Sequence, residues 1–172
     1  MNNLPIPVSW TEFKNNVSIR FNNILDGFDK FENFTIDGNF SENSEACLIN
    51  FLLQVFEEND NECYIDFYIN KLNEIEIKNL MNLIDENDKT LLNSIISIKH
   101  NDVYYKITDK NLIPFFAKLN IKELFFVTFY FTKKPVTVWG NYNLKFPCFF
   151  NDDKTLSEIY DIAYKLNIIK NI

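Results

Sequence analysis

The stretch FFVTFYFTKKPVTVWGNYNLKFPCFF, residues 125–150, decides the fold class of this 172-residue chain. It predicts strands over 125–132, 136–139 and 144–150, because runs of aromatic and β-branched residues alternate with the turn sequences Lys-Lys-Pro and Gly-Asn-Tyr-Asn. Strands that are joined by such short turns must pair antiparallel. The stretch therefore predicts the centre of an antiparallel sheet.

Side chains of the first of these strands alternate between two faces. One face is apolar and is formed by Phe125, Val127, Phe129 and Phe131. The other combines rings with hydroxyl groups and is formed by Phe126, Thr128, Tyr130 and Thr132, continued by Thr137 and Trp139. Two interpretations of this second face stay open. Either helices cover it and its rings belong to the core, or it binds a partner or lines a ligand cleft.

The N-terminal third predicts helices around one short extended segment. Ser9 and Glu12 form a capping box, and apolar residues at helical spacing continue the helix to a stop at Asp26-Gly27. An extended piece that turns at Asp37-Gly38 follows. The apolar run within 42–58 then predicts a helix that is buried on most sides.

The middle and the end of the chain mix both kinds of element. Alternation over 63–69 predicts a strand, and Asn73 with Glu76 caps the next helix. Residues 94–107 predict a hairpin that turns at His100 to Asp102, and a short helix with Pro114 in its first turn follows. The last element is an amphipathic helix over 156–164.

Taken together, these elements predict the α+β class and one domain over residues 1–172. We expect a single antiparallel or mixed β-sheet of about five to six strands, with helices packed mainly on one face. Pro and Gly are too sparse to mark a domain boundary.

Acidic residues outnumber basic ones by 24 to 17, which gives a formal net charge of −7. Such a surface disfavours nucleic acid and anionic membranes and favours basic partners. Many of the carboxylates concentrate in two predicted loops, where they either attract a partner or merely face solvent. The candidate partner-binding residues in these loops are Glu57, Glu58, Asp60, Glu62, Asp85, Glu86 and Asp88.

Composition also argues against several kinds of site and location. Three scattered cysteines and one histidine provide no zinc spacing, and three glycines provide no phosphate loop, so we expect no metal and no cofactor. The N-terminal sequence MNNLPIPVSW shows no signal peptide, and no apolar run is long enough to cross a membrane. These features predict a cytoplasmic protein.

The search for catalytic residues gives one ambiguous candidate. His100 is the only histidine and lies in a predicted turn without a nucleophile nearby in the sequence. Asp66 stands on a predicted strand between Tyr64 and Tyr68, where it is either an acid with a shifted pKa or an outward-facing strand residue. No enzyme signature emerges, so we expect a non-catalytic protein.

Residues 122–167 resemble the small immunity proteins of bacterial toxin–immunity systems, including the contact-dependent inhibition type. The residues that carry the resemblance are Phe129-Tyr130-Phe131, Pro135, Trp139, Tyr142, Phe146 and Phe149-Phe150, followed by the closing helix. The resemblance implies a stoichiometric binding protein that neutralises a cognate bacterial toxin and has no catalytic residues. An acidic inhibitor of this kind would suit a basic toxin, such as a nuclease.

Two other functions remain open from the sequence. One is a small-ligand-binding protein or an enzyme with a cleft beside Tyr130, Trp139 and Asn141; the other is a non-catalytic structural protein that oligomerises. Tyr130, Trp139, Asn141 and Tyr142 complete the set of candidate partner-binding residues.

Overall fold

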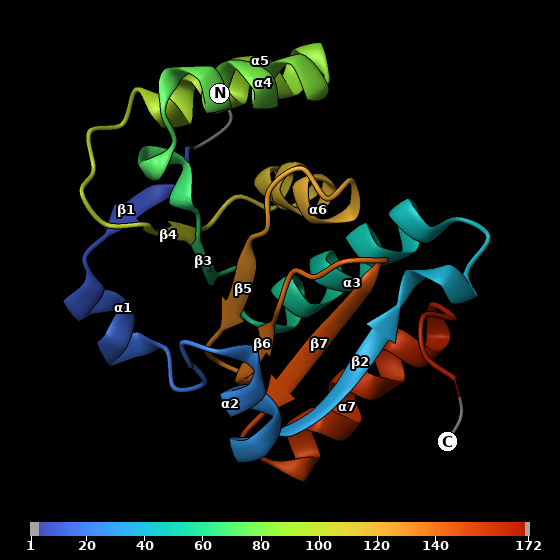
Figure 1. The fold of residues 1–172 in the computed structure, drawn as a ribbon. Helices are drawn as coiled ribbons and strands as arrows, with labels where there is room; N and C mark the ends of the chain where they lie inside the picture. The colour runs from blue at the N-terminus through green and yellow to red at the C-terminus, as the bar shows by residue number, and fades with distance from the viewer. Residues whose placement is uncertain (1–3, 171–172) are drawn as a thin grey trace.

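A computed structural model describes residues 4–170 and contains one antiparallel sheet in the order β1-β4-β3-β5-β6-β7-β2 (Figure 1). Its strands are β1 (Ile6–Val8), β2 (Glu32–Asp37), β3 (Cys63–Asp66), β4 (Tyr104–Ile107), β5 (Thr128–Phe131), β6 (Val136–Val138) and β7 (Lys145–Phe150). The α+β class and the antiparallel pairing are confirmed, but the sheet has seven strands rather than five or six. β1 was not predicted, because a three-residue strand that contains Pro7 is too short to show alternation.

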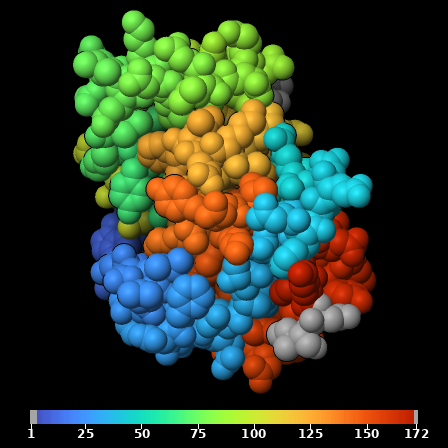
Figure 2. Space-filling model, turned by 45° about the vertical axis from the view of Figure 1, so that its right-hand side comes forward, coloured from blue at the N-terminus to red at the C-terminus, as the bar shows by residue number. Residues whose placement is uncertain are grey.

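Seven α-helices surround this sheet within the described residues, and the 3-10 turns η1 (Gly38–Phe40), η2 (Tyr68–Lys71) and η3 (Lys110–Leu112) link them to it. The helices are α1 (Trp10–Asn16), α2 (Ile24–Lys30), α3 (Ser44–Glu58), α4 (Glu74–Leu83), α5 (Glu86–Ile96), α6 (Ile113–Ile121) and α7 (Asp153–Lys165). Side chains from α3 to α7 join one core cluster with Phe129 and Phe131. Figures 1 and 2 show α4 and α5 together at one end of the molecule, next to α6.

The central strand β5 is buried at every position and separates two apolar clusters. Phe129 and Phe131 point into the main core, whereas Tyr130 packs on the opposite face with Tyr64 from β3 and Phe13 from α1. The predicted alternation of β5 is therefore confirmed. Most helices do lie on one face, but α1 and α2 cover part of the other (Figure 1).

The single N-terminal helix that the sequence predicts is wrong, because the chain forms two short helices there. α1 ends at Asn16, and Val17 is already extended, with φ −97° and ψ 114°. The backbone then crosses the sheet, held by a hydrogen bond of 2.7 Å from the Thr137 hydroxyl to the Ile19 carbonyl oxygen. Gly27, the predicted stop, lies inside α2, where a Cβ atom would come within 2.7 Å of the Phe21 ring. Close packing, rather than helix termination, explains this glycine.

The hairpin predicted over 94–107 is also wrong. Residues up to Ile96 belong to α5, which buries Leu92 and Ile95, and β4 pairs instead with β1 and β3. A short apolar run such as Ser-Ile-Ile-Ser does not distinguish a strand from one turn of a packed helix. The predicted strand over 63–69 is likewise shorter than expected, because η2 begins at Tyr68.

Asn120 links the end of α6 to the chain that leads into β5. Its side chain is 2% exposed; the amide nitrogen donates to the Val127 carbonyl oxygen at 2.8 Å, and the amide oxygen accepts from the Val127 N–H at 2.7 Å. A Cβ atom at position 140 would lie 2.4 Å from this amide oxygen, so only glycine fits beside it. Asn120 therefore fixes the entry into the central strand.

Asn120→Ala should destabilise the protein by about 2–4 kcal/mol, because it leaves a buried backbone donor and acceptor without partners. Urea unfolding followed by circular dichroism measures the change. Asn93→Ala, at an exposed position of α5, is the matched control and should shift stability by less than about 0.5 kcal/mol. Equal effects of the two substitutions would contradict the role given to Asn120.

Candidate functional site

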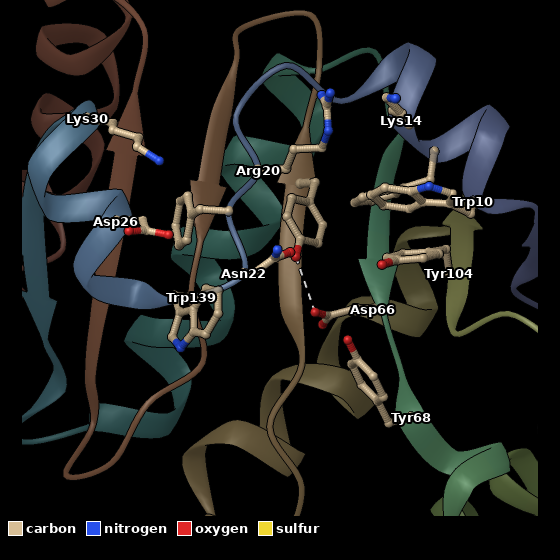
Figure 3. Close-up of a pocket in the computed structure, with 13 residues that line it drawn as sticks. Trp10, Lys14, Arg20, Asn22, Asp26, Lys30, Asp66, Tyr68, Tyr104 and Trp139 are labelled. Atoms are coloured by element: carbon tan, nitrogen blue, oxygen red, sulfur yellow. Dashed lines mark hydrogen bonds between the residues drawn. The ribbon is translucent and has the colours of Figure 1, made fainter.

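A pocket of about 580 Å³ lies on the α1–α2 side of the sheet (Figure 3). Its size is in the range of small-molecule sites. The walls come from α1, α2 and the segment between them, from β3, β4 and β5, from Tyr68 in η2, and from Trp139 directly after β6. Seven of the thirteen lining residues are aromatic, three are basic and two are acidic.

Asp66, at the end of β3, places its carboxyl group in this pocket. It accepts hydrogen bonds from the Thr128 N–H at 2.7 Å and from the Tyr130 hydroxyl at 3.2 Å. Burial disfavours the ionised form and raises the pKa of Asp66 from 3.8 to about 6, although these hydrogen bonds oppose the shift. Of the two interpretations that the sequence left open for Asp66, an acid with a shifted pKa is therefore favoured over an outward-facing strand residue.

Strand pairing brings the neighbours of Asp66 to it. Asp66 lies opposite Tyr104 on β4 and opposite Thr128 on β5. Tyr130 follows Thr128 at the next position on the same face of β5, since side chains alternate. Tyr68 belongs to η2, yet Figure 3 shows its hydroxyl directed back toward the Asp66 carboxyl group.

Three tyrosine hydroxyls thus surround one carboxyl group, and all three remain protonated at neutral pH. Burial raises the pKa of Tyr104 to about 12, with further contributions from Tyr68 and Asp66. Burial and the charge of Asp66 also raise the pKa of Tyr68 and of Tyr130. The hydroxyls are consequently neutral hydrogen-bond donors rather than phenolates.

Stacked rings build both ends of the pocket. On one side Phe13 stacks on Tyr104 with ring centroids 4.0 Å apart, and Trp10, which is 44% exposed, lies 5.5 Å from the same ring. On the other side Phe21 stacks on Trp139 at 5.3 Å, in the space that Gly27 leaves. The aromatic wall is therefore held by ring-to-ring contacts that do not involve a ligand.

Charges in the pocket are separated from one another. Lys14, Arg20 and Lys30 line it, and none of them forms an ion pair with a carboxylate within residues 4–170. The Arg20 guanidinium donates instead to the Val17 carbonyl oxygen. The hydrogen-bond partners of the Asp66 side chain in this part of the chain are all neutral. Among the described residues, therefore, Asp66 has no paired cation, and Lys14, Arg20 and Lys30 have no paired carboxylate.

Of the four candidate binding residues in the C-terminal part of the sequence, two lie in the pocket and two lie outside it. Tyr130 and Trp139 line the pocket, which therefore lies where the sequence analysis expected a cleft. Asn141 and Tyr142 do not belong to it; Tyr142 is 59% exposed and packs edge-on against Phe126 with centroids 4.6 Å apart.

The first acidic segment forms ion pairs with lysines of the same chain. The pairs are Glu57–Lys110 at 3.9 Å, Glu58–Lys134 at 2.6 Å, Asp60–Lys133 at 3.6 Å and Glu62–Lys106 at 2.8 Å. Each carboxylate that the sequence offers to a basic partner therefore already has a cation beside it. These pairs lie partly or wholly in solvent and add little to stability.

The second acidic segment is paired in the same way and starts a helix instead of forming a loop. The pairs are Asp85 with Lys118 at 3.7 Å and Lys122 at 3.6 Å, Glu86 with Lys89 at 2.6 Å, and Asp88 with Lys118 at 3.4 Å. Asp85 is the N-cap of α5, and Glu86 and Asp88 lie in its first turn. Asp85 forms no side-chain capping hydrogen bond, so the favourable interaction of these carboxylates with the helix dipole accounts for the cluster.

Several pocket residues had no clear signal in the sequence. Arg20 stood out only as the single arginine, and Trp10, Asn22 and Tyr104 come from distant parts of the chain that only the fold brings together. His100 lies apart from the pocket and packs on Tyr105 at 5.4 Å. Its Nε2 atom is buried without a hydrogen-bond partner in the described part of the chain.

The chain matches no protein-family model, and searches of curated proteins and of solved structures returned no match. Within residues 4–170 no group of His, Cys, Asp or Glu side chains is arranged to hold a metal ion. No helix in that range has both the length and the apolar character needed to cross a membrane. The geometry and charges of the pocket are therefore the guide to its function.

Asp66→Asn should stabilise the protein at neutral pH. The pKa of Asp66 is higher in the folded state than its ordinary value of 3.8, so the folded state loses stability as pH rises from about 4 to about 6. A shift of this size corresponds to at most about 3 kcal/mol. Asparagine stays neutral and keeps an acceptor for the Thr128 N–H. We expect a gain of about 1–3 kcal/mol in the free energy of unfolding near pH 7.5, and almost none near pH 4.

Urea unfolding at the two pH values measures this difference. Asp161→Asn, on the exposed side of α7, is the matched control and should change stability by less than about 0.5 kcal/mol at either pH. A loss of stability in Asp66→Asn at neutral pH would show that the ionised carboxylate supports the fold rather than straining it.

Proposed function

We propose that this protein binds a small organic ammonium ion in the Asp66 pocket. The observation that carries the proposal is a half-buried carboxyl group that faces a pocket of about 580 Å³ and whose hydrogen-bond partners within residues 4–170 are all neutral. Buried charges in proteins are normally paired with a counter-ion. A bound cation would provide the missing one.

The surroundings of Asp66 suit an ammonium group in two ways. Tyr68, Tyr104, Tyr130 and the rings beyond them present aromatic surface, and such surface attracts organic cations through the ring quadrupole. The second reason concerns the ionisation of Asp66. Burial makes the ionised carboxylate unfavourable when no ligand is bound, whereas a bound cation would favour it and lower the pKa of Asp66. Ligand binding and ionisation of Asp66 are therefore expected to be coupled.

The proposal predicts that choline or ethanolamine binds and that the uncharged choline isostere 3,3-dimethyl-1-butanol binds about 10–100-fold more weakly, since it cannot pair with the carboxylate. Choline affinity should rise with pH between about 5 and 7, because protonation of Asp66 competes with the cation below its pKa of about 6. Isothermal titration calorimetry across this pH range measures both effects.

Asp66→Asn should reduce choline affinity by about 10-fold or more and remove its dependence on pH. Asp161→Asn, whose carboxylate lies on α7 and outside the pocket, should leave both unchanged. Equal affinity for choline and for its neutral isostere would refute a cation site, and so would a failure of both cations to bind.

A second function, neutralisation of a cognate bacterial toxin, is favoured by the exposed ring of Tyr142 in the turn between β6 and β7. Exposed tyrosines are frequent anchors at protein interfaces, and the ring of Tyr142 is held by its edge-to-face contact with Phe126. Net charge supports the idea less than the sequence suggests, because the carboxylates of both acidic segments pair with lysines.

This second function predicts that co-expression protects cells from the toxic domain of a large secreted protein encoded beside it. Tyr142→Ala should then shorten the residence time of the complex by about 10-fold or more, measured by surface plasmon resonance. Ile75→Ala, at an exposed position of α4, is the control. Absence of both protection and binding would remove this function and leave the pocket proposal intact.

A further inference from the structure

The ligand of the Asp66 pocket, we infer, is a zwitterion that carries an anionic group as well as the ammonium group. This inference rests on the proposed function, because it assumes that the cationic end pairs with Asp66. It adds a second recognition element, formed by Arg20 and Lys14, that binds a carboxylate or a phosphate. The grounds for it are the separated charges of the pocket.

Just over half of the lysines in this acidic chain have a carboxylate partner. Nine of the sixteen lysines take part in ion pairs within residues 4–170. In the same part of the chain the pocket gathers three basic side chains, Lys14, Arg20 and Lys30, and none of them is in an ion pair. An excess of unpaired cations around one cavity of a protein with net charge −7 favours an anionic group inside it.

Arg20 is the residue best placed to hold that group. It is the only arginine, it is half-buried, and its guanidinium is fixed from one side by the Val17 carbonyl oxygen. A guanidinium has five donors in a planar fork, so several remain for a carboxylate or phosphate that approaches from the pocket. Figure 3 shows Arg20 and Lys14 on the α1 side of the pocket, away from the Asp66 carboxyl group.

The two other charged residues of the pocket, Asp26 and Lys30, do not change the separation of negative Asp66 from positive Arg20 and Lys14. Asp26 and Lys30 both belong to α2 and lie one turn apart on the same side of that helix. Figure 3 shows both at the left of the view beside α2, with Asp66 on the other side of the pocket. Their opposite charges offset each other there. What remains is a negative group at Asp66 and positive groups at Arg20 and Lys14, the complement of a zwitterion.

The test compares choline, which carries the cation alone, with phosphocholine and glycine betaine, which add a phosphate or a carboxylate, and with inorganic phosphate. Calorimetry at low salt should give at least one zwitterion an affinity about 10-fold or more above that of choline. The zwitterion that binds more tightly identifies the anionic group. Raising the salt should reduce this advantage, because the Lys14 and Arg20 side of the pocket is open to solvent.

Arg20→Gln and Lys14→Gln should each remove a large part of that advantage, measured in each variant as the ratio of the zwitterion's affinity to that of choline. Lys78→Gln, at an exposed position of α4 outside the pocket, is the matched control and should change neither affinity. Lys14 is exposed, so its variant keeps the test valid if Arg20→Gln folds poorly.

The outcomes separate this inference from the proposed function. If choline binds and neither zwitterion binds more tightly, the zwitterion inference is overturned and the cation site stands. If choline and both zwitterions fail to bind, the proposed function and the inference fall together. If inorganic phosphate binds and choline does not, the pocket is an anion site, which also overturns both.

Discussion

The burial of β5 on both faces is the constraint on which the rest of the structure depends. All four of its residues are buried, so each face of the sheet needs a cover at that strand. Helices α3 to α7 supply a continuous layer behind it. In front, α1 and α2 have only seven residues each, and the segment between them crosses the sheet held by the bond from Thr137 to Ile19. A cover this thin leaves a cavity, and the pocket is that cavity.

The placement of Asp66 in this cavity works against stability. An ionised carboxyl group there has given up much of its hydration in exchange for two hydrogen bonds from neutral donors, and its pKa of about 6 reflects the balance. A chain under no demand but folding would be more stable with an uncharged residue at this position. Strain of this kind, at the centre of a cavity with rings and unpaired cations, is typical of a binding site.

The sequence predicted correctly those elements that depend on interactions between near neighbours in the chain. It failed where contacts between distant segments determine the local structure. Alternation around Phe129 and Tyr130 located β5 and separated its faces, and the Asn73–Glu76 capping box located α4, because both signals depend on near neighbours. The break between α1 and α2 depends instead on contacts with Thr137, over a hundred residues away, and no local pattern encodes it. For the site, Tyr130 and Trp139 were predicted, whereas Arg20 and Tyr104 reach the pocket only through strand order and chain crossing.

Net charge was the least informative property of the chain, because pairing decides which charges act on a partner. The carboxylates of both acidic segments face lysines within 4.0 Å, so their fields largely cancel beyond the first solvent layers. The few charges left without a partner at the pocket act at short range on whatever enters it, where less water screens them. A molecule that entered the pocket would therefore experience Asp66 on one side and Arg20 on the other rather than the average of −7. The proposed polarity of the ligand follows from this local separation of charge and not from the net charge.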